Sequence, residues 1–258
     1  MLKKRAYQIA IPLLAILLFF STQASSLAHL DNTKVDWWLV RGKEHTTPRV
    51  NDTLKFDFKT YDAYYVGDTS RSVLYLTFDE GYEKGYTPAI LDTLKANDVK
   101  AIFFVTYPYL NTNPDLIKRM ISEGHIVANH SNHHPSMPGY TGDESKFNRE
   151  FQDVEDKYKE ITGQEMVKLF RPPMGHYSEK SLAMTKNLGY KTVFWSFAYS
   201  DYNVDKQPSH ASAQKIILDN LHNGSIVLLH AVSKTNTEIL DGILKEAKNQ
   251  GYTFELFS

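Results

Sequence analysis

Short apolar runs alternate with amphipathic stretches from residue 73 to residue 256, and this alternation constrains the fold more than any other feature. Seven runs are four to six residues long and have the apolar character of buried strands: 73–78, 101–106, 125–128, 167–170, 191–196, 225–229 and 252–256. The intervening stretches repeat apolar residues at helical spacing, which predicts helices at 86–97, from 113 onward, and at 143–162, 178–188, 209–222 and 239–247. Continuous apolar strands joined by helices indicate a parallel sheet covered on both faces.

We therefore expect an α/β fold, a (β/α) barrel of seven parallel strands, with an open doubly wound sheet as the alternative. The 258 residues are 42% hydrophobic and 23% charged, which is the composition of an ordinary globular chain. The sequence has no Gly-x-x-x-x-Gly-Lys phosphate loop, and Gly81 and Gly85 do not complete a dinucleotide-binding fingerprint. We expect no nucleotide cofactor.

The N-terminus has the pattern of an export signal. Three basic residues at 3–5 precede an apolar run at 9–20, and small residues follow, with cleavage options after Ala24 or Ala28. A membrane anchor is the alternative, although the run is shorter than the roughly 20 residues that span a bilayer comfortably. We expect a signal peptide at 1–28, an aromatic-rich extension at 29–70 that packs on the core, and a catalytic domain at 71–258. The protein is then exported.

Charge and cysteine content exclude several classes of protein. Lys and Arg total 29 and Asp and Glu total 30, so the chain lacks the basic excess of a nucleic-acid binder. Cysteine is absent, which excludes disulfides, thiol catalysis, cysteine-ligated zinc and iron–sulfur clusters. Any transition-metal site must therefore use histidine and carboxylate ligands.

Ionisable side chains follow five of the predicted strands, each where the strand ends. They are Asp79 and Glu80 after the first strand, His130 and His134 after the third, Arg171 after the fourth, Asp201 after the fifth and His230 at the end of the sixth. The carboxyl ends of parallel barrel strands face one rim, and such barrels build their active sites there. We expect these groups to meet at that rim.

A metal site is one role for this cluster. His130 and His134 share a face if their segment forms a helical turn, and two imidazoles at that spacing can hold a metal ion. Zinc fits two neutral imidazoles plus a carboxylate, and cobalt, iron, nickel or manganese suit the same ligands. A surface loop without a ligand is the alternative. Adjacent strand residues point to opposite faces, so Asp79 and Glu80 fit a division between metal ligand and base better than a glycosidase pair.

Three further residues have a catalytic interpretation, and for Arg171 and His230 there is also a structural one. Arg171 begins the rigid RPPMG segment, and its guanidinium can orient a carboxylate or form a structural salt bridge. The backbone N–H of Met174 can serve as an oxyanion donor. His230 is either catalytic or a core histidine, and the neighbouring motifs favour catalysis. Aromatic residues near the rim can stack on sugar rings or belong to the core: Tyr107, Tyr177, Trp195 and Tyr202.

Five motifs occur in a fixed order along the chain. They are TFDEGY at 77–82, HSNHHP at 130–135, RPPMG at 171–175, FWSFAYSD at 194–201 and LLH at 228–230. Together they resemble the motifs of the polysaccharide deacetylases, the NodB-homology group also called carbohydrate esterase family 4. The resemblance covers about residues 70–258 and is closest to the delta-lactam-biosynthetic de-N-acetylases of spore-forming bacteria, the PdaA type.

The resemblance implies a distorted barrel and a hydrolase that removes acetate from N-acetylmuramic acid of peptidoglycan, on the route to muramic δ-lactam in the spore cortex. It also implies a role for each motif residue. Asp79 is the base, Glu80, His130 and His134 hold one divalent metal ion, Arg171 holds the base, Asp201 tunes the general acid His230, and the Met174 N–H completes the oxyanion hole. The resemblance further implies a peptidoglycan glycan strand as partner, bound by a monomer, and hence an exported protein that is associated with the cell wall.

Two positions depart from the common pattern. The family has Asp where this chain has Glu80, and many relatives have Tyr where it has Met174. Glu is one methylene longer than Asp, so the change at position 80 bears on metal affinity and on the choice of metal. Two other functions stay open on the sequence: a deacetylase of chitin-like N-acetylglucosamine oligomers, and a non-catalytic glycan-binding protein on the same fold.

Overall fold

A computed structural model describes residues 27–50 and 53–257, and the predicted signal segment therefore lies almost entirely outside the described residues. The centre of the molecule is an eight-stranded sheet with the strand order β11-β5-β6-β7-β8-β10-β4, and β12 also pairs with β5. The strands are β4 (Ala63–Tyr64), β5 (Val73–Glu80), β6 (Ile102–Val105), β7 (Ile126–Asn129), β8 (Leu169–Phe170), β10 (Lys191–Val193), β11 (Ser225–His230) and β12 (Thr253–Phe254). Every pairing between these strands is parallel.

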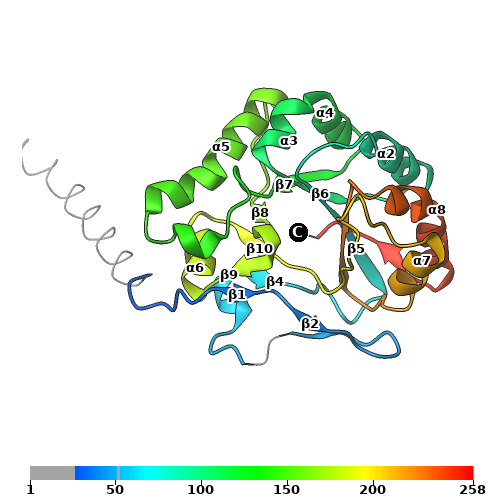
Figure 1. The fold of residues 1–258 in the computed structure, drawn as a ribbon, viewed down its shortest axis with the longest axis horizontal. Helices are drawn as coiled ribbons and strands as arrows, with labels where there is room; N and C mark the ends of the chain where they lie inside the picture. Colours follow the sequence, from blue (N-terminus) through cyan, green and yellow to red (C-terminus); the bar gives the residue numbers. More distant parts are fainter. Residues whose placement is uncertain (1–26, 51–52, 258) are drawn as a thin grey trace, which may run out of the picture.

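The sheet curls into a distorted barrel, which confirms the expected fold and excludes the open sheet. The strands lie at the centre of Figure 1 and the helices surround them on the outside. A parallel bridge between Phe197 and Val227 brings the segment after β10 against β11, the strand at the other end of the sheet order. The seven expected strands are present, and β4 from the N-terminal segment adds an eighth.

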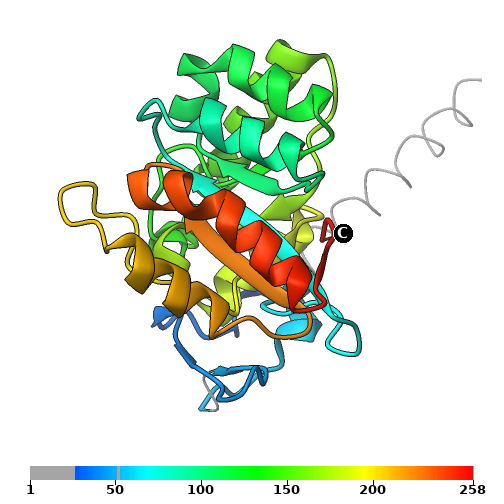
Figure 2. The same cartoon turned by 90° about the vertical axis from the view of Figure 1, so that its right-hand side faces the viewer.

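The outer helices occupy the positions that the apolar spacing predicts, with one addition. They are α2 (Thr87–Ala96), α3 (Tyr107–Thr112), α4 (Pro114–Ser122), α5 (Glu144–Thr162), α6 (Glu179–Asn187), α7 (His210–Leu218) and α8 (Lys234–Asn249). The sequence reading missed α3, which is only six residues long and begins after the capping residue Thr106. Figure 2 shows α7 and α8 side by side over the β11 edge of the sheet.

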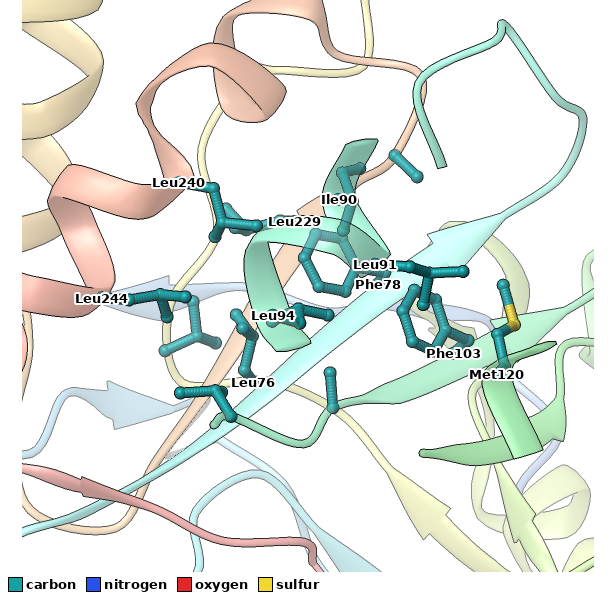
Figure 3. Packing of buried hydrophobic residues seen from close by; sticks show 14 of the residues in the cluster. Leu76, Phe78, Ile90, Leu91, Leu94, Phe103, Met120, Leu229, Leu240 and Leu244 are labelled. Carbon is teal, nitrogen blue, oxygen red and sulfur yellow. The ribbon is translucent and has the colours of Figure 1, made fainter. Parts of the chain in front are cut away.

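Alternation along β5 divides the core into two clusters, and it decides where the site residues point. All eight residues of β5 are buried. Leu74, Leu76 and Phe78 belong to the cluster between the sheet and the outer helices, which Figure 3 shows packed against residues of α2 and α8. Val73 and Tyr75 belong to a separate cluster with residues of β6, β10 and β11 inside the barrel. Because side chains alternate along a strand, Asp79 lies on the same face of β5 as Val73 and Tyr75, inside the barrel. Glu80 lies on the opposite face, toward the outer helices.

The N-terminal segment closes one side of the barrel. β1 (Val35–Asp36) pairs with β9 (His176–Tyr177), β2 (Leu39–Val40) pairs with β3 (Arg49–Val50), and β4 joins the main sheet beside β10. Trp37 is 9% exposed and stacks on Phe194, with ring centroids 4.3 Å apart. The segment therefore contributes to the core. Within the described ranges, no helix has the length and apolar character needed to cross a membrane.

Candidate active site

A cavity of about 930 Å³ opens at the carboxyl ends of the strands. Five of the eight residues expected at the site line it: Asp79, His130, His134, Met174 and His230. Arg171 and Asp201 are fully buried behind this wall, and each hydrogen-bonds a lining residue. The structure thus brings together seven of the eight residues that the motifs single out, and Glu80 is the exception.

Arg171 holds Asp79 in its ionised form. Arg171 Nη1 donates to Asp79 Oδ1 at 2.8 Å and to Thr77 Oγ1 at 2.8 Å, while Nε donates to the Val193 carbonyl at 3.0 Å. Its guanidinium also lies 4.1 Å from the ring centroid of Phe104. Burial raises the pKa of Asp79, but the charges of Arg171, His130 and His230 outweigh it, and the pKa is lowered overall. Asp79 is therefore a carboxylate that can accept a proton inside the cavity.

His130 and His134 present neutral imidazoles to the same space. His130 Nδ1 donates to the Arg171 carbonyl at 2.8 Å, which leaves Nε2 without its proton and 3.5 Å from Asp79 Oδ2. The two imidazole centroids are 4.9 Å apart. Burial lowers the pKa of His130 to about 4 and also lowers the pKa of His134. Both rings are therefore unprotonated near pH 7, which is the state that binds metal ions.

The segment that carries these histidines is a loop, so the two rings do not share a face through a helical turn. Ser131 has φ of 70° and His134 has φ of 56°, both in the left-handed region. Two side chains stabilise this backbone, because Ser131 N donates to Asn129 Oδ1 at 2.8 Å and His134 N donates to Ser131 Oγ at 2.9 Å. Such local bonds compete with helix formation. The two rings still converge, through a loop instead of a helical face.

The structure does not bring Glu80 to the two histidines, which corrects the expected three-residue metal set. Glu80 is fully buried on the helix side of β5, where Thr87 Oγ1 of α2 donates to its Oε1 at 3.3 Å. Its Oε2 has no hydrogen-bond partner among the described atoms. Burial raises the pKa of Glu80 well above its usual value, and the nearby charges of Glu83 and Asp79 raise it further. The strand alternation points this carboxyl away from the cavity.

The cavity wall offers metal-binding chemistry without Glu80. Across residues 27–50 and 53–257, no three histidine or carboxylate groups form a ready-made metal cluster. Asp79 is the only carboxylate among the residues that line the cavity. Two neutral imidazoles are donors that zinc prefers, and the ionised Asp79 beside them adds negative charge that favours a cation. The wall formed by His130 and His134 therefore suits a divalent ion.

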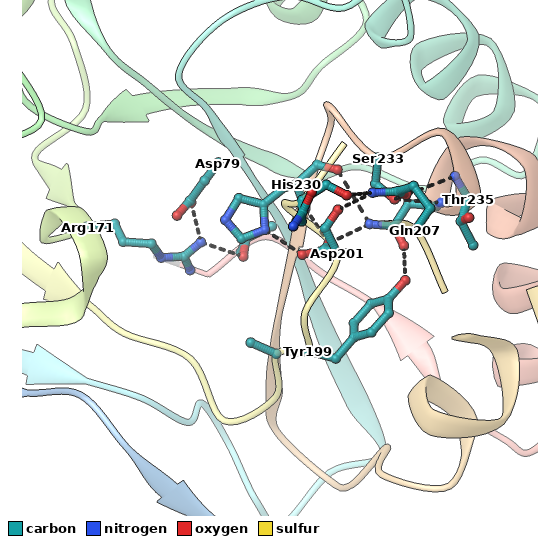
Figure 4. A network of polar contacts seen from close by, with 12 residues as sticks. Asp79, Arg171, Tyr199, Asp201, Gln207, His230, Ser233 and Thr235 are labelled. Carbon is teal, nitrogen blue, oxygen red and sulfur yellow. Dashed lines mark hydrogen bonds and ion pairs between the residues drawn. The ribbon is translucent and has the colours of Figure 1, made fainter. Parts of the chain in front are cut away.

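His230 lies across the cavity and is paired with Asp201. Its Nδ1 donates to Asp201 Oδ1 at 2.7 Å, and its backbone N–H donates to Asp201 Oδ2 at 2.8 Å. Burial lowers the pKa of His230, but the charge and hydrogen bond of Asp201 outweigh it and raise the pKa overall. Figure 4 shows the ring between Asp201 and the Arg171–Asp79 pair. With Nδ1 occupied, Nε2 is the nitrogen that can deliver a proton.

The RPPMG segment forms a tight turn at the cavity mouth. Met174 is 51% exposed and has φ of 57°, and Gly175 follows with φ of 68°. A Cβ on Gly175 would lie 2.6 Å from Trp37 Cβ, so only glycine fits this approach. The turn fixes the Met174 peptide at the edge of the cavity. Its role as an oxyanion donor stays a prediction.

Aromatic side chains surround the mouth of the cavity. Tyr82 and Tyr202 line it and are 51% and 60% exposed, and Trp195 also lines it. Tyr177 does not reach the cavity, because it is buried in the cluster around Trp37. The sequence reading did not single out Tyr82, although it belongs to the first motif and directly follows Gly81.

Comparison with known proteins identifies relatives of this chain. The family model "Polysaccharide deacetylase" matches residues 66–193. The chain is 41% identical over 232 residues to the peptidoglycan-N-acetylmuramic acid deacetylase PdaA of Bacillus subtilis, across 90% of this chain and 88% of that protein. The solved structure of B. subtilis PdaA, a family 4 carbohydrate esterase, covers 88% of this chain and 96% of its own, with a TM-score of 0.84.

Two solved structures from Bacillus anthracis are also similar. A family 4 carbohydrate esterase is 40% identical, with a TM-score of 0.71, over 88% of this chain and 95% of that one. A family 4 pseudoenzyme is 27% identical, with a TM-score of 0.68, over 74% of this chain and 66% of that one. The fold therefore occurs with and without activity, and the residues in the cavity carry the functional argument.

Proposed function

Because this chain belongs to the polysaccharide deacetylases, the family 4 carbohydrate esterases, we propose that it removes acetate from N-acetylmuramic acid of peptidoglycan in a metal-dependent reaction. As a member of this family it is a hydrolase that acts on an N-acetyl amide. The observation that carries the proposal is the convergence of Asp79, His130, His134 and His230 on one cavity. The 41% identity to the N-acetylmuramic acid deacetylase of B. subtilis supports the choice of sugar.

The cavity contains a base and an acid with suitable protonation states. Asp79, ionised beside Arg171, accepts a proton from the attacking water. His230, protonated beside Asp201, gives its Nε2 proton to the sugar amine as the C–N bond breaks. The Met174 N–H donates to the developing oxyanion. His130 and His134 hold the divalent ion, zinc in our proposal, which when bound polarises the acetamide carbonyl and lowers the pKa of water.

The product chemistry connects this reaction to muramic δ-lactam. Deacetylation leaves a free amine on a sugar that also carries a lactyl carboxyl group, and these two groups can condense to a lactam. We therefore place the reaction before δ-lactam formation in the spore cortex. The substrate lies outside the cytoplasm, which agrees with the export signal at 1–28. Sequencing the N-terminus of the protein recovered from the cell-wall fraction would test export and the cleavage site.

The first experiment is acetate release from peptide-free peptidoglycan strands by the purified chain from residue 29. Release that stops with a chelator and returns with zinc is the expected result. Release that is unaffected by the chelator would overturn the metal dependence. Release from chitin oligomers alone would replace the muramic substrate with N-acetylglucosamine. Binding to either glycan without any release would establish the glycan-binding alternative.

A further inference from the structure

Behind His230 lies a buried polar group that the catalytic motifs do not include. Asn236, in the first turn of α8, is 2% exposed. Its Nδ2 donates to Asp201 Oδ2 at 2.6 Å, and its Oδ1 accepts a hydrogen bond from the Tyr199 hydroxyl. Figure 4 shows this network between the helix and the loop that carries Asp201.

The hydrogen bonds determine the orientation of the Asn236 amide. An ionised carboxylate only accepts hydrogen bonds, so the amide must turn Nδ2 toward Asp201 and Oδ1 toward Tyr199. Asp201 then has two anchors on Oδ2, the His230 backbone N–H and the Asn236 amide, while Oδ1 faces the His230 ring. Two anchors on one oxygen restrict rotation of the carboxylate about its own axis.

A second set of bonds attaches the Asp201 loop to α8. Gln207 Nε2 donates to the Asp201 carbonyl at 2.8 Å, and Gln207 Oε1 accepts from Ser233 Oγ at 2.6 Å. Ser233 is the N-cap of α8 and accepts from Asn236 N at 3.1 Å. Asn236 therefore acts from a capped helix end that is already tied to the loop. Groups held on such rigid elements position their partners more accurately than loop residues do.

We propose that Asn236 is a positioning residue for the His230–Asp201 pair and that Tyr199 fixes the Asn236 amide. The inference rests on the proposed function, in which His230 donates a proton to the leaving amine. Asn236 is buried and is not among the residues that line the cavity, so it acts through Asp201. It keeps the Asp201 carboxylate aligned with the His230 ring and thereby keeps Nε2 directed at the cavity.

The charges around His230 predict the consequence of losing this alignment. The charged groups that act on the ring are Asp201, Asp79 and Arg171, His134 lies on the neighbouring wall, and the Tyr202 ring packs edge-on with its centroid 5.7 Å away. Asp201 makes the largest favourable contribution to protonation, against the cost of burial. If its carboxylate turns away, burial and Arg171 favour the neutral ring. His230 then loses its proton at a lower pH than in the wild type. As the pH rises, activity that needs this acid therefore begins to decline at a lower pH than in the wild type.

The test compares Asn236→Leu with a matched control in the same helical turn. Asn236→Leu removes both polar atoms at nearly constant size. Thr237→Val is the control, because Thr237 Oγ1 donates to the Ser233 carbonyl and makes no bond to Asp201. Histidine NMR titration of the labelled protein measures the His230 pKa directly, and acetate release from peptide-free strands gives kcat and KM against pH.

We expect Asn236→Leu to lower the measured His230 pKa by about one pH unit and kcat at alkaline pH by about tenfold, with little change in KM. Tyr199→Phe, which removes one hydroxyl, should lower the His230 pKa and kcat at alkaline pH by smaller amounts. The double variant is no worse than Asn236→Leu, because both residues act through Asp201. Thr237→Val leaves the pKa and the pH profile unchanged.

Two results would overturn the inference: an unchanged His230 pKa in folded Asn236→Leu, or an equal change in Thr237→Val. If Asn236→Leu does not fold, Tyr199→Phe decides, and a wild-type pH profile in that variant counts against the inference. The NMR titration needs no substrate. A wild-type protein that releases no acetate would therefore refute the proposed function while the positioning role is still decided by the titration.

Discussion

Asp79 and Glu80 follow one another on β5 and face opposite sides of it. Asp79 meets Arg171 in the barrel interior, whereas Glu80 meets Thr87 under the helix layer. The motif pattern predicts both residues at the site, but the alternation of a buried strand separates them. The sequence could identify the carboxylates and could not decide which one faces the cavity, because every residue of β5 is buried and both sides are therefore interior.

Asp79→Asn tests the role of the base. We expect acetate release to fall by roughly 100- to 10,000-fold, because the amide cannot accept the proton from water. Zinc binding measured by calorimetry should persist, since His130 and His134 are unchanged. Loss of zinc binding in this variant would make Asp79 a metal ligand. The unfolding midpoint should also fall, because the buried Arg171 loses its counter-charge.

Glu80→Gln tests the correction at the metal site. Glu80 is fully buried on the helix side of β5, its pKa is raised by burial, and glutamine has nearly its shape without a charge. We expect zinc affinity measured by calorimetry to match the wild type. His134→Ala is the control that should lose zinc binding and keep its fold, because this ring lies on the cavity wall. Loss of zinc binding in a folded Glu80→Gln variant would show that Glu80 is a metal ligand.

At the scale of elements, apolar periodicity predicts the long, continuous strands and helices. The strands at 73–80 and 225–230 and the helix at 144–162 lie close to where the sequence places them. The loop at 130–134 and the two-residue strand β4 do not follow from periodicity. The loop depends on bonds from Asn129 and Ser131 side chains to backbone N–H groups, and β4 depends on pairing with β10. Neither kind of contact leaves a repeating pattern in the sequence.

His125, at the start of β7, makes the sheet sensitive to acid. Its Nδ1 accepts a hydrogen bond from the Ala101 backbone N–H at 3.1 Å, next to the start of β6. Burial, with a smaller effect from the charge of Lys100, lowers its pKa to about 4. In the unfolded chain the ring binds a proton below about pH 6.5. Between pH 6.5 and 4 the unfolded state therefore binds more protons, and stability falls as the pH falls.

His125→Asn measures this contribution, because its side-chain oxygen can still accept from Ala101. We expect the wild type to lose on the order of 1 to 3 kcal/mol of stability from this residue between pH 6.5 and 4. Urea unfolding at several pH values should give a shallower decline for the variant. Parallel declines for the two proteins would show that His125 is protonated equally in the folded and unfolded chains.

At the scale of the whole molecule, residues 27–50 and 53–65 lie before the region that the family model matches and still belong to the folded body. Trp37 contacts Phe58, Tyr65, Tyr177, Phe194 and Trp195, and its ring N–H donates to the Trp195 carbonyl at 3.2 Å. Trp195 also lines the cavity. The N-terminal segment therefore supports one wall of the site from behind.

Trp37→Ala should destabilise the protein by about 3 to 5 kcal/mol, the usual cost of removing a large buried aromatic side chain. Trp38→Ala is the matched control, because the adjacent indole is 43% exposed and its removal should cost less than about 1 kcal/mol. Urea unfolding of the three proteins measures both effects. Equal losses would mean that the segment does not form part of the core in solution.

The buried Arg171–Asp79 pair has a consequence for how this lineage can change. Arg171 has no access to solvent, so a mutation that removes the Asp79 charge leaves a buried cation without its counter-charge. A mutation of Arg171 alone leaves a buried anion without its counter-charge. Each single step costs stability that the double step restores, which makes the two positions epistatic. Descendants that lose catalysis and keep the glycan cleft should first change His134 or His230, which line the cavity. In such inactive descendants, Asp79 and Arg171 should be either both retained or both replaced.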